Sequence, residues 1–202
     1  MTTIPKSKLN TVKNLYYEKG NSMNDIASKL GVSLKSVIYF MQINNLKRRN
    51  YQEANNNFFQ HKPLSFNIKK QLKNKERELL IKAVMIYWCE GAKGFKTGTV
   101  DFANCNPEML KIFMLFLRKI CRVDESRIRI YMYCYSNQNI ERNIKYWSYI
   151  VNVPISQFTK PYIRNDFRKD KINKMPHGMI HIRYADKKLL KIINDWIIEY
   201  SK

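Results

Sequence analysis

The sequence predicts an α+β fold in two parts: a unit of three short helices, then a larger unit of helices packed on an antiparallel sheet. Residues 6–46 contain only helical periodicities separated by short turns, whereas residues 76–202 alternate helical segments with strand-like segments. Between them, residues 51–75 lose the apolar period and contain three consecutive asparagines and a proline, which is typical of a linker. We therefore expect domains at 1–50 and 76–202, joined by a basic linker with a short helix near residues 68–72.

The chain is strongly basic, with 37 Lys and Arg against 16 Asp and Glu and a net charge of +21 over 202 residues. Residues 1–75 contain 14 basic and 3 acidic side chains, and the remainder contains 23 and 13, so both parts carry the excess. A surplus of this size predicts a polyanionic partner, and nucleic acid is the usual one. No membrane partner is expected, because no apolar run reaches the length of a membrane span and no basic amphipathic helix stands alone.

The cysteines favour reduced thiols over a zinc site or a disulfide framework. They lie far apart in apolar surroundings and form no C-x-x-C pair. The first residues, Met1 to Lys6, contain no apolar signal core, so we expect a cytoplasmic protein.

The first unit is expected to consist of three helices with clear start and stop signals. The first spans residues 6–19 and ends at Gly20. Ser22 is a good N-cap for the second, and Ser33 for a third that runs to about Asn44.

The segment Asp25-Ile-Ala-Ser-Lys-Leu-Gly-Val-Ser-Leu-Lys-Ser-Val37 resembles the helix-turn-helix family. Ala27 is small enough for the two helices to approach, and Gly31 turns the chain four residues later. The resemblance implies that the third helix enters the major groove of double-stranded DNA. The residues implied to face base edges or flanking phosphates are Lys35, Ser36, Tyr39 and Gln42, and those suited to phosphate contacts are Lys47, Arg48 and Arg49. The alternative is a three-helix module for protein contacts with a solvated basic surface.

The second unit is expected to open with an apolar helix that ends on an acid and a glycine. Apolar residues cover nearly its whole circumference, which predicts burial on more than one side. Glu90 lies at the C-terminal end, where the helix dipole disfavours a carboxylate. We expect Gly91 to end the helix in the left-handed conformation.

The remaining elements alternate between strands and helices. They are a strand at 98–104, a helix opened by Asn106 and Pro107, a strand at 127–135, a helix at 140–151, strands at 162–164 and 178–184, and a helix opened by Asp186. Within 127–135, Arg127, Arg129 and Tyr131 share one face and apolar residues share the other. This cationic face fits a sheet lying on DNA, and an ordinary solvated strand is the alternative.

The run Ala83-Val-Met-Ile-Tyr-Trp-Cys-Glu-Gly91, followed by the strand around residues 100–104, resembles the LAGLIDADG homing endonuclease family over about residues 76–200. The resemblance implies that two such helices pack side by side and that each delivers one acid to a shared metal. Because the chain has one such motif, it implies a homodimer through the helix ending at Glu90. Family helices carry small residues where they touch; Ala83 fits this pattern, whereas Val84 and Met85 are bulky.

Glu90 is therefore the candidate metal ligand and catalytic residue, with Mg²⁺ as the implied cofactor. Lys93 is a candidate catalytic residue that could hold the scissile phosphate, and Asp101 is a possible second carboxylate. The alternatives are a Glu90 carboxylate paired with a nearby lysine and a Lys93 that is an ordinary loop residue. His177 and His181 are expected on a strand rather than at a metal site.

The resulting hypothesis is a double-stranded DNA-binding protein that cleaves its target as a homing-type, magnesium-dependent endonuclease. The alternative is a DNA-binding transcription regulator, built from the same two domains, that does not cleave. RNA binding is a third hypothesis, disfavoured because no RNA-specific module is visible.

Overall fold

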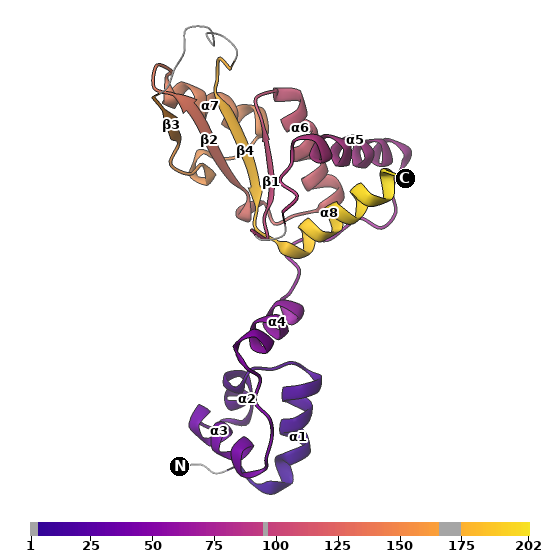
Figure 1. Cartoon of the computed structure of the whole chain (residues 1–202), viewed down its shortest axis with the longest axis vertical. Helices are drawn as coiled ribbons and strands as arrows, with labels where there is room; N and C mark the ends of the chain where they lie inside the picture. The colour runs from indigo at the N-terminus through magenta and orange to yellow at the C-terminus, as the bar shows by residue number, and fades with distance from the viewer. Residues whose placement is uncertain (1–3, 95–96, 166–174) are drawn as a thin grey trace. The chain divides into compact units, whose positions relative to one another are not determined.

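The computed structural model describes residues 4–94, 97–165 and 175–202, and it confirms the α+β class. The chain divides into two compact units, Met1–Pro63 and Leu64–Lys202, each with its own core (Figure 1).

The first unit contains the expected helices. A continuous helical segment is formed by η1 (Lys6–Lys8), α1 (Leu9–Lys13) and η2 (Asn14–Glu18), and it is followed by α2 (Met23–Leu30) and α3 (Leu34–Ile43). Ser22 caps α2 in a capping box with Asp25, and Ser33 caps α3 by accepting a hydrogen bond from the Ser36 amide. Gly31 ends α2 in the left-handed conformation, with φ of 64°. The core consists of Val12, Tyr16, Ile26, Ala27, Val37, Phe40 and Met41.

The segment expected to be a linker contains a helix in a different place from the prediction. Helix α4 (Tyr51–His61) starts with a capping box between Asn50 and Glu53. The short helix expected near residues 68–72 is absent, so that prediction was wrong. Instead, the amides of Asn67 and Lys69 donate to the carbonyls of Cys121 and Ile120 at 3.0 and 2.9 Å. This extended course buries Phe66 in the second unit.

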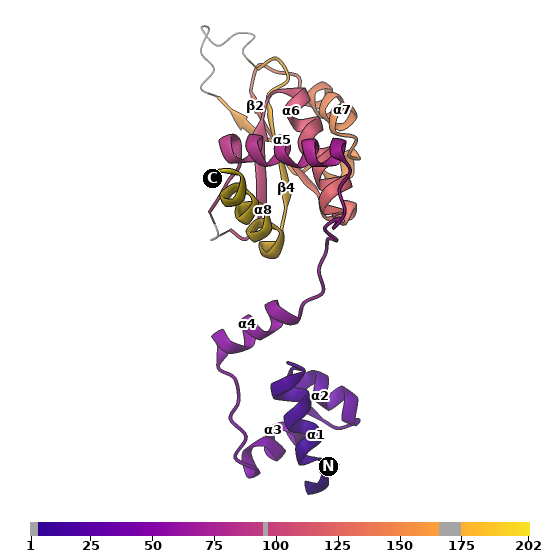
Figure 2. The same ribbon diagram turned by 90° about the vertical axis from the view of Figure 1, so that its right-hand side faces the viewer.

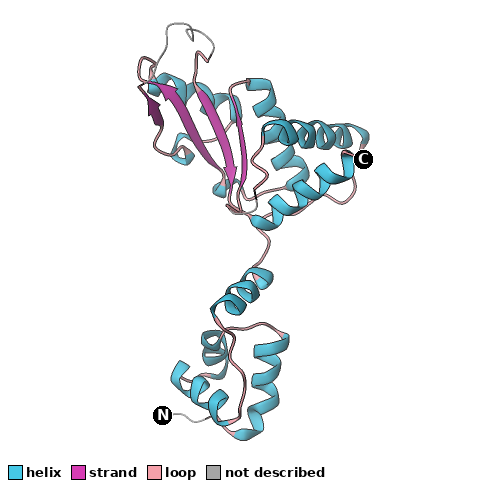
Figure 3. Ribbon diagram, viewed as in Figure 1, coloured by secondary structure: helices cyan, strands magenta, loops and turns pink. Residues whose placement is uncertain are grey.

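The described residues of the second unit form a four-stranded mixed sheet in the order β1-β4-β2-β3 (Figure 3). The strands are β1 (Val100–Asn104), β2 (Arg129–Tyr135), β3 (Tyr162–Arg164) and β4 (Met179–Tyr184). β4 pairs antiparallel with β1 and β2, whereas β2 and β3 are parallel. The expected antiparallel sheet is therefore only partly correct. The helical crossover between β2 and β3 returns the chain in the same direction, which produces a parallel pair.

Helices cover one face of this sheet (Figure 2). They are α5 (Asn74–Glu90), α6 (Pro107–Phe116) with its extension η3 (Leu117–Cys121), α7 (Ile140–Val151) and α8 (Lys187–Tyr200), and short turns form η4 (Glu125–Arg127) and η5 (Ile155–Gln157). In β4, Ile180 and Ile182 are fully buried against the helices, while His181 and Arg183 alternate onto the opposite, open face. Within the described residues of the second unit, no helix covers this opposite face of the sheet.

Candidate nucleic-acid interface

The exposed side of α3 carries three of the residues predicted to face DNA. Lys35, Tyr39 and Gln42 are exposed and recur at about one helical turn, with Tyr39 60% exposed. Ser36 is half-buried, and its hydroxyl lies 2.9 Å from that of Ser33, within the helix cap. The structure thus gives Ser36 a capping role that the sequence interpretation did not include.

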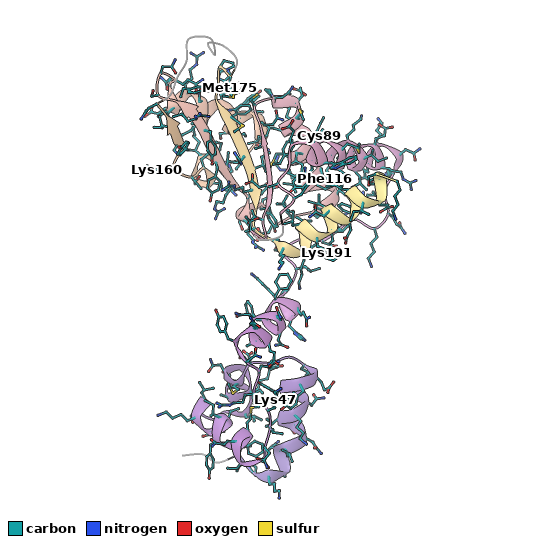
Figure 4. All side chains as sticks on the ribbon, in the orientation of Figure 1. Lys47, Cys89, Phe116, Lys160, Met175 and Lys191 are labelled. Atoms are coloured by element: carbon teal, nitrogen blue, oxygen red, sulfur yellow. The ribbon has the colours of Figure 1, made fainter. Side chains whose placement is uncertain are left out.

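The basic cluster after α3 divides into two exposed cations and one anchored cation. Lys47 and Arg48 are exposed (Lys47 is labelled in Figure 4). The Arg49 guanidinium lies over the Tyr16 ring, 3.9 Å from its centroid, and donates to the Asn21 carbonyl at 2.5 Å. The Arg49 amide also donates to the Tyr16 hydroxyl at 2.8 Å. Arg49 therefore fastens this segment to the three-helix core and fixes the position of Lys47 and Arg48.

Gly91 ends α5 in an extended conformation, with φ of −83° and ψ of 151°, so the left-handed stop predicted from the sequence was wrong. A Cβ atom at Gly91 would lie 2.5 Å from the ring of Tyr87. Tyr87 is fully buried, and its hydroxyl donates to the Ala92 carbonyl at 2.6 Å. Glycine is required here because the chain passes directly over this ring. Burial raises the pKa of the Tyr87 phenol.

Glu90 occupies the last position of α5 and is exposed. In the part of the chain that the structure describes, its carboxylate has no hydrogen-bond or ion-pair partner. Lys93 instead donates from its Nζ to the Trp88 carbonyl at 2.6 Å. This contact satisfies a free carbonyl at the helix end and places a cation where the dipole favours one. Glu90 and Lys93 thus lie at the same helix end without pairing.

Helix α5 is buried on one side only, so the expected burial on more than one side was wrong. Ala83 and Val84 are fully buried in the core of the same unit. Ile81, Met85 and Trp88 form an exposed apolar stripe one turn apart, with exposed fractions of 40, 37 and 41%. We call these three residues the α5 stripe. A partner helix would meet this stripe rather than the small residue Ala83.

The open sheet face holds Asp101 between two basic side chains. Its carboxylate accepts from His181 Nδ1 at 2.8 Å and from Arg183 Nε at 2.7 Å. Burial opposes ionisation, but the hydrogen bonds and charges of His181 and Arg183 together hold the pKa of Asp101 below its usual range. Each oxygen of Asp101 therefore already accepts a hydrogen bond, and the charge of the Arg183 guanidinium beside it disfavours a metal cation at this carboxylate.

The arginines predicted for this face occupy different positions. Arg127 precedes β2, in η4, because the strand begins at Arg129 and not at 127 as expected. Its guanidinium donates to the Ala185 carbonyl at 2.7 Å and lies over the Tyr184 ring. Arg129 is exposed on the strand, and one guanidinium nitrogen donates to the carbonyls of Ser126 and Ile128. Arg127 therefore braces one end of the sheet, and Arg129 lies at the edge of the open face.

The two histidines lie in separate environments. His177 precedes β4; its ring stacks on Tyr146 at a centroid distance of 3.8 Å, and its Nδ1 lies 3.2 Å from Asn143 Oδ1. His181 lies on the open face with Asp101. Among the described residues, no group of three or more His, Cys, Asp or Glu side chains could hold a metal ion.

A basic hollow in the second unit was missed by the sequence interpretation. It has a volume of about 540 Å³, and its lining includes Lys69, Lys70, Lys73 and Arg122. Lys69 pairs with Glu76 at 2.5 Å. The lysine-rich run at 69–75 is the sequence signal that could have indicated this hollow. Arg122 is distant in sequence, and the hydrogen bonds from Asn67 and Lys69 to Cys121 and Ile120 bring it to the hollow.

Comparisons with protein-family models, with curated proteins and with solved structures found no significant match. Of the helices in the described ranges, none has the length and apolar character needed to cross a membrane.

Proposed function

We propose that the protein binds double-stranded DNA and reads its sequence with α3 in the major groove. The observation that carries this proposal is the exposed row of Lys35, Tyr39 and Gln42 on a helix whose opposite side is locked into the three-helix core. Lysine and glutamine side chains can hydrogen-bond to base edges, and a tyrosine can contact bases or the backbone. The α3 helix has the dimensions that a major groove admits.

Charge supports the same proposal. Lys47 and Arg48 lie exposed just beyond α3, where they suit phosphate contacts that set the register of the helix. The second unit adds the basic hollow and the cationic groups of the open sheet face. The excess of positive charge in both parts of the chain suits two sites of contact with one polyanion.

A selection of bound sequences from a random duplex library tests this proposal. Wild type is expected to recover a defined motif, and a variant with Lys35→Ala and Gln42→Ala a degenerate one. Recovery of the same motif by both proteins would contradict reading by α3. Failure of the wild type to retain any duplex would contradict DNA binding itself.

Cleavage of the bound DNA by a homodimer is the second candidate function, and it is favoured by the open carboxylate of Glu90 at the C-terminal end of α5. Magnesium accepts one or two carboxylates together with water and phosphate oxygens, so Glu90 fits as one ligand. Asp101 is already hydrogen-bonded to His181 and Arg183, so it is a poor second metal ligand. A second carboxylate would instead come from the Glu90 of another copy if two copies meet through α5. The ion would offset charge on the phosphate and activate water.

Replacement of Glu90 by Gln separates the two candidates. We expect E90Q to bind DNA as wild type does and to lose magnesium-dependent plasmid cleavage. If wild type cleaves no substrate library with Mg²⁺ or Mn²⁺ but retains its motif, the non-cleaving regulator is correct. A structured RNA that outcompetes the selected duplex would instead favour the RNA-binding alternative.

A further inference from the structure

The open face of the sheet carries a row of flat side chains that crosses three strands. The His181 ring on β4 lies 4.8 Å from the Tyr133 ring on β2, and Tyr133 lies 5.3 Å from Tyr162 on β3, measured between ring centroids. Tyr133 and Tyr162 are direct partners in the β2–β3 register. The residues that alternate with this row, such as Met132 and Ile180, are buried on the helix side.

A planar guanidinium group lies beside this row of rings. The Arg183 guanidinium is over the Tyr131 ring, 4.1 Å from its centroid. Tyr131 pairs in register with His181, so Arg183 and His181 are neighbours along β4 and face neighbouring tyrosines of β2. We call His181, Tyr133, Tyr162, Tyr131 and Arg183 the sheet platform.

Asp101 fixes the two basic members of the sheet platform. One carboxylate oxygen accepts from His181 Nδ1 and the other from Arg183 Nε, as described above. The Asp101 side chain is only 16% exposed, so both contacts are shielded from water. The His181 ring and the Arg183 guanidinium are therefore held in place before a ligand binds, which reduces the conformational entropy lost on binding.

The exposure of the sheet platform leaves its outer surface open to a ligand. Tyr162 is 60% exposed, and the Arg183 side chain is 30% exposed. The three rings of the row are tilted by 36° and 48° against one another, and a guanidinium lies beside them over a fourth ring. Such a surface suits nucleobases, which stack on aromatic rings and on guanidinium planes while their phosphates meet positive charge.

We infer that the sheet platform binds unpaired nucleobases by stacking. Bases inside a duplex cover one another's faces, so only unpaired or extruded bases can use these rings. The inference rests on the proposed nucleic-acid binding and deepens it: α3 reads paired DNA, and the platform takes a strand that is open, distorted or single. DNA and RNA strands share this chemistry, and the experiment below distinguishes them.

The test uses the full chain and a 12-nucleotide single strand with a central 2-aminopurine, followed by anisotropy and by the fluorescence of the modified base. The same sequence is prepared as DNA, as RNA and as a fully paired DNA duplex. The variants are Tyr162→Ala and Tyr133→Leu. The matched control is Tyr149→Ala, since Tyr149 is 85% exposed but lies on α7, which covers the other face.

Wild type is expected to bind the DNA or the RNA strand and to change the fluorescence of the modified base. Each platform variant should weaken single-strand affinity by roughly 5- to 100-fold, the effect of losing one stacked base, without changing affinity for the duplex. Tyr149→Ala should change neither. Tyr162 is largely exposed, so its replacement by alanine should leave thermal unfolding unchanged and keep the test valid.

Unchanged single-strand affinity in both variants would overturn the inference while leaving duplex binding by α3 intact. Duplex binding with no single-strand binding by wild type would overturn it equally. Single-strand binding that depends on the platform, without any duplex binding, would support the inference and contradict the proposed function. Whichever strand binds more tightly, DNA or RNA, identifies the source of the unpaired base.

Discussion

Asp101 ties β1 to β4 through two charge-assisted hydrogen bonds, and its ionisation should therefore support the fold. The pKa of Asp101 is below its ordinary value of 3.8. The stabilisation is fully present above that ordinary pKa and is lost as the pH falls through the lower value in the folded state. We expect Asp101→Asn to lower the free energy of unfolding at pH 7 by about 1–3 kcal/mol.

Urea unfolding of wild type and Asp101→Asn across pH tests this expectation. The difference in unfolding free energy between the two proteins should be constant near neutrality and should shrink on acidification below roughly pH 4. A difference that stays the same down to pH 2.5 would show that the ionised carboxylate contributes no stability.

Gly91 is expected to tolerate no side chain, because a Cβ atom would fall 2.5 Å from the buried Tyr87 ring. We predict that Gly91→Ala lowers the free energy of unfolding by about 1–3 kcal/mol, as overpacking does in well-packed cores. Gly94→Ala is the matched control, since a Cβ atom there meets nothing within 4 Å. Equal thermal stability of the two variants would contradict this account of Gly91.

Single-residue roles were predictable where they depend on local pattern and not where they depend on distant contacts. The exposure of Lys35, Tyr39 and Gln42 follows from helical periodicity alone. Arg49 resembles its basic neighbours in the sequence, but it stacks on Tyr16, which is 33 residues away. Gly91 looked like a helix stop, and its actual constraint is the ring of Tyr87.

At the scale of elements, substitutions in α3 and in the segment after it should distinguish base recognition from phosphate binding. Lys35→Ala or Gln42→Ala should cost about 1–3 kcal/mol against the preferred duplex and little against a scrambled one. Arg48→Ala should weaken binding to both duplexes alike. Anisotropy titrations of the three variants measure this, and a uniform loss for Lys35→Ala and Gln42→Ala would assign α3 to the backbone only.

The α5 stripe makes a separate prediction about assembly. If two copies meet through α5, Met85→Lys should convert the dimer to a monomer in sedimentation velocity, because it would bury an unpaired charge in the contact. Leu115→Lys on α6 is the control, since Leu115 is similarly exposed at 41%. A wild-type protein that remains monomeric on its DNA would contradict the shared site at Glu90.

Helix limits were predictable because their signals are local, and strand order was not. Ser22, Ser33, Asn106 and Asp186 each cap the helix expected after them. The parallel pairing of β2 with β3 depends on how α7 packs, which no local pattern specifies. The sequence also predicts a polar, basic loop at 165–174, and this segment lies outside the described residues except for Asn165.

At the scale of the whole molecule, the excess of positive charge is spread over both units. The sequence alone indicated a nucleic-acid partner from the net charge of +21. The structure shows that the side chains of Lys47 and Arg48 are exposed. Those of Arg49 and Arg127 are instead held by hydrogen bonds and ring contacts within the protein. Only the open cations are expected to release counterions from DNA on binding.

The affinity of the intact protein for its selected duplex, titrated by anisotropy at increasing salt, tests the DNA-binding claim most directly. We predict that the logarithm of the association constant falls linearly with the logarithm of salt concentration, with a slope of about −4 or steeper. The selected duplex should remain favoured over a scrambled one throughout. A flat salt response with no preference between the duplexes would contradict the account.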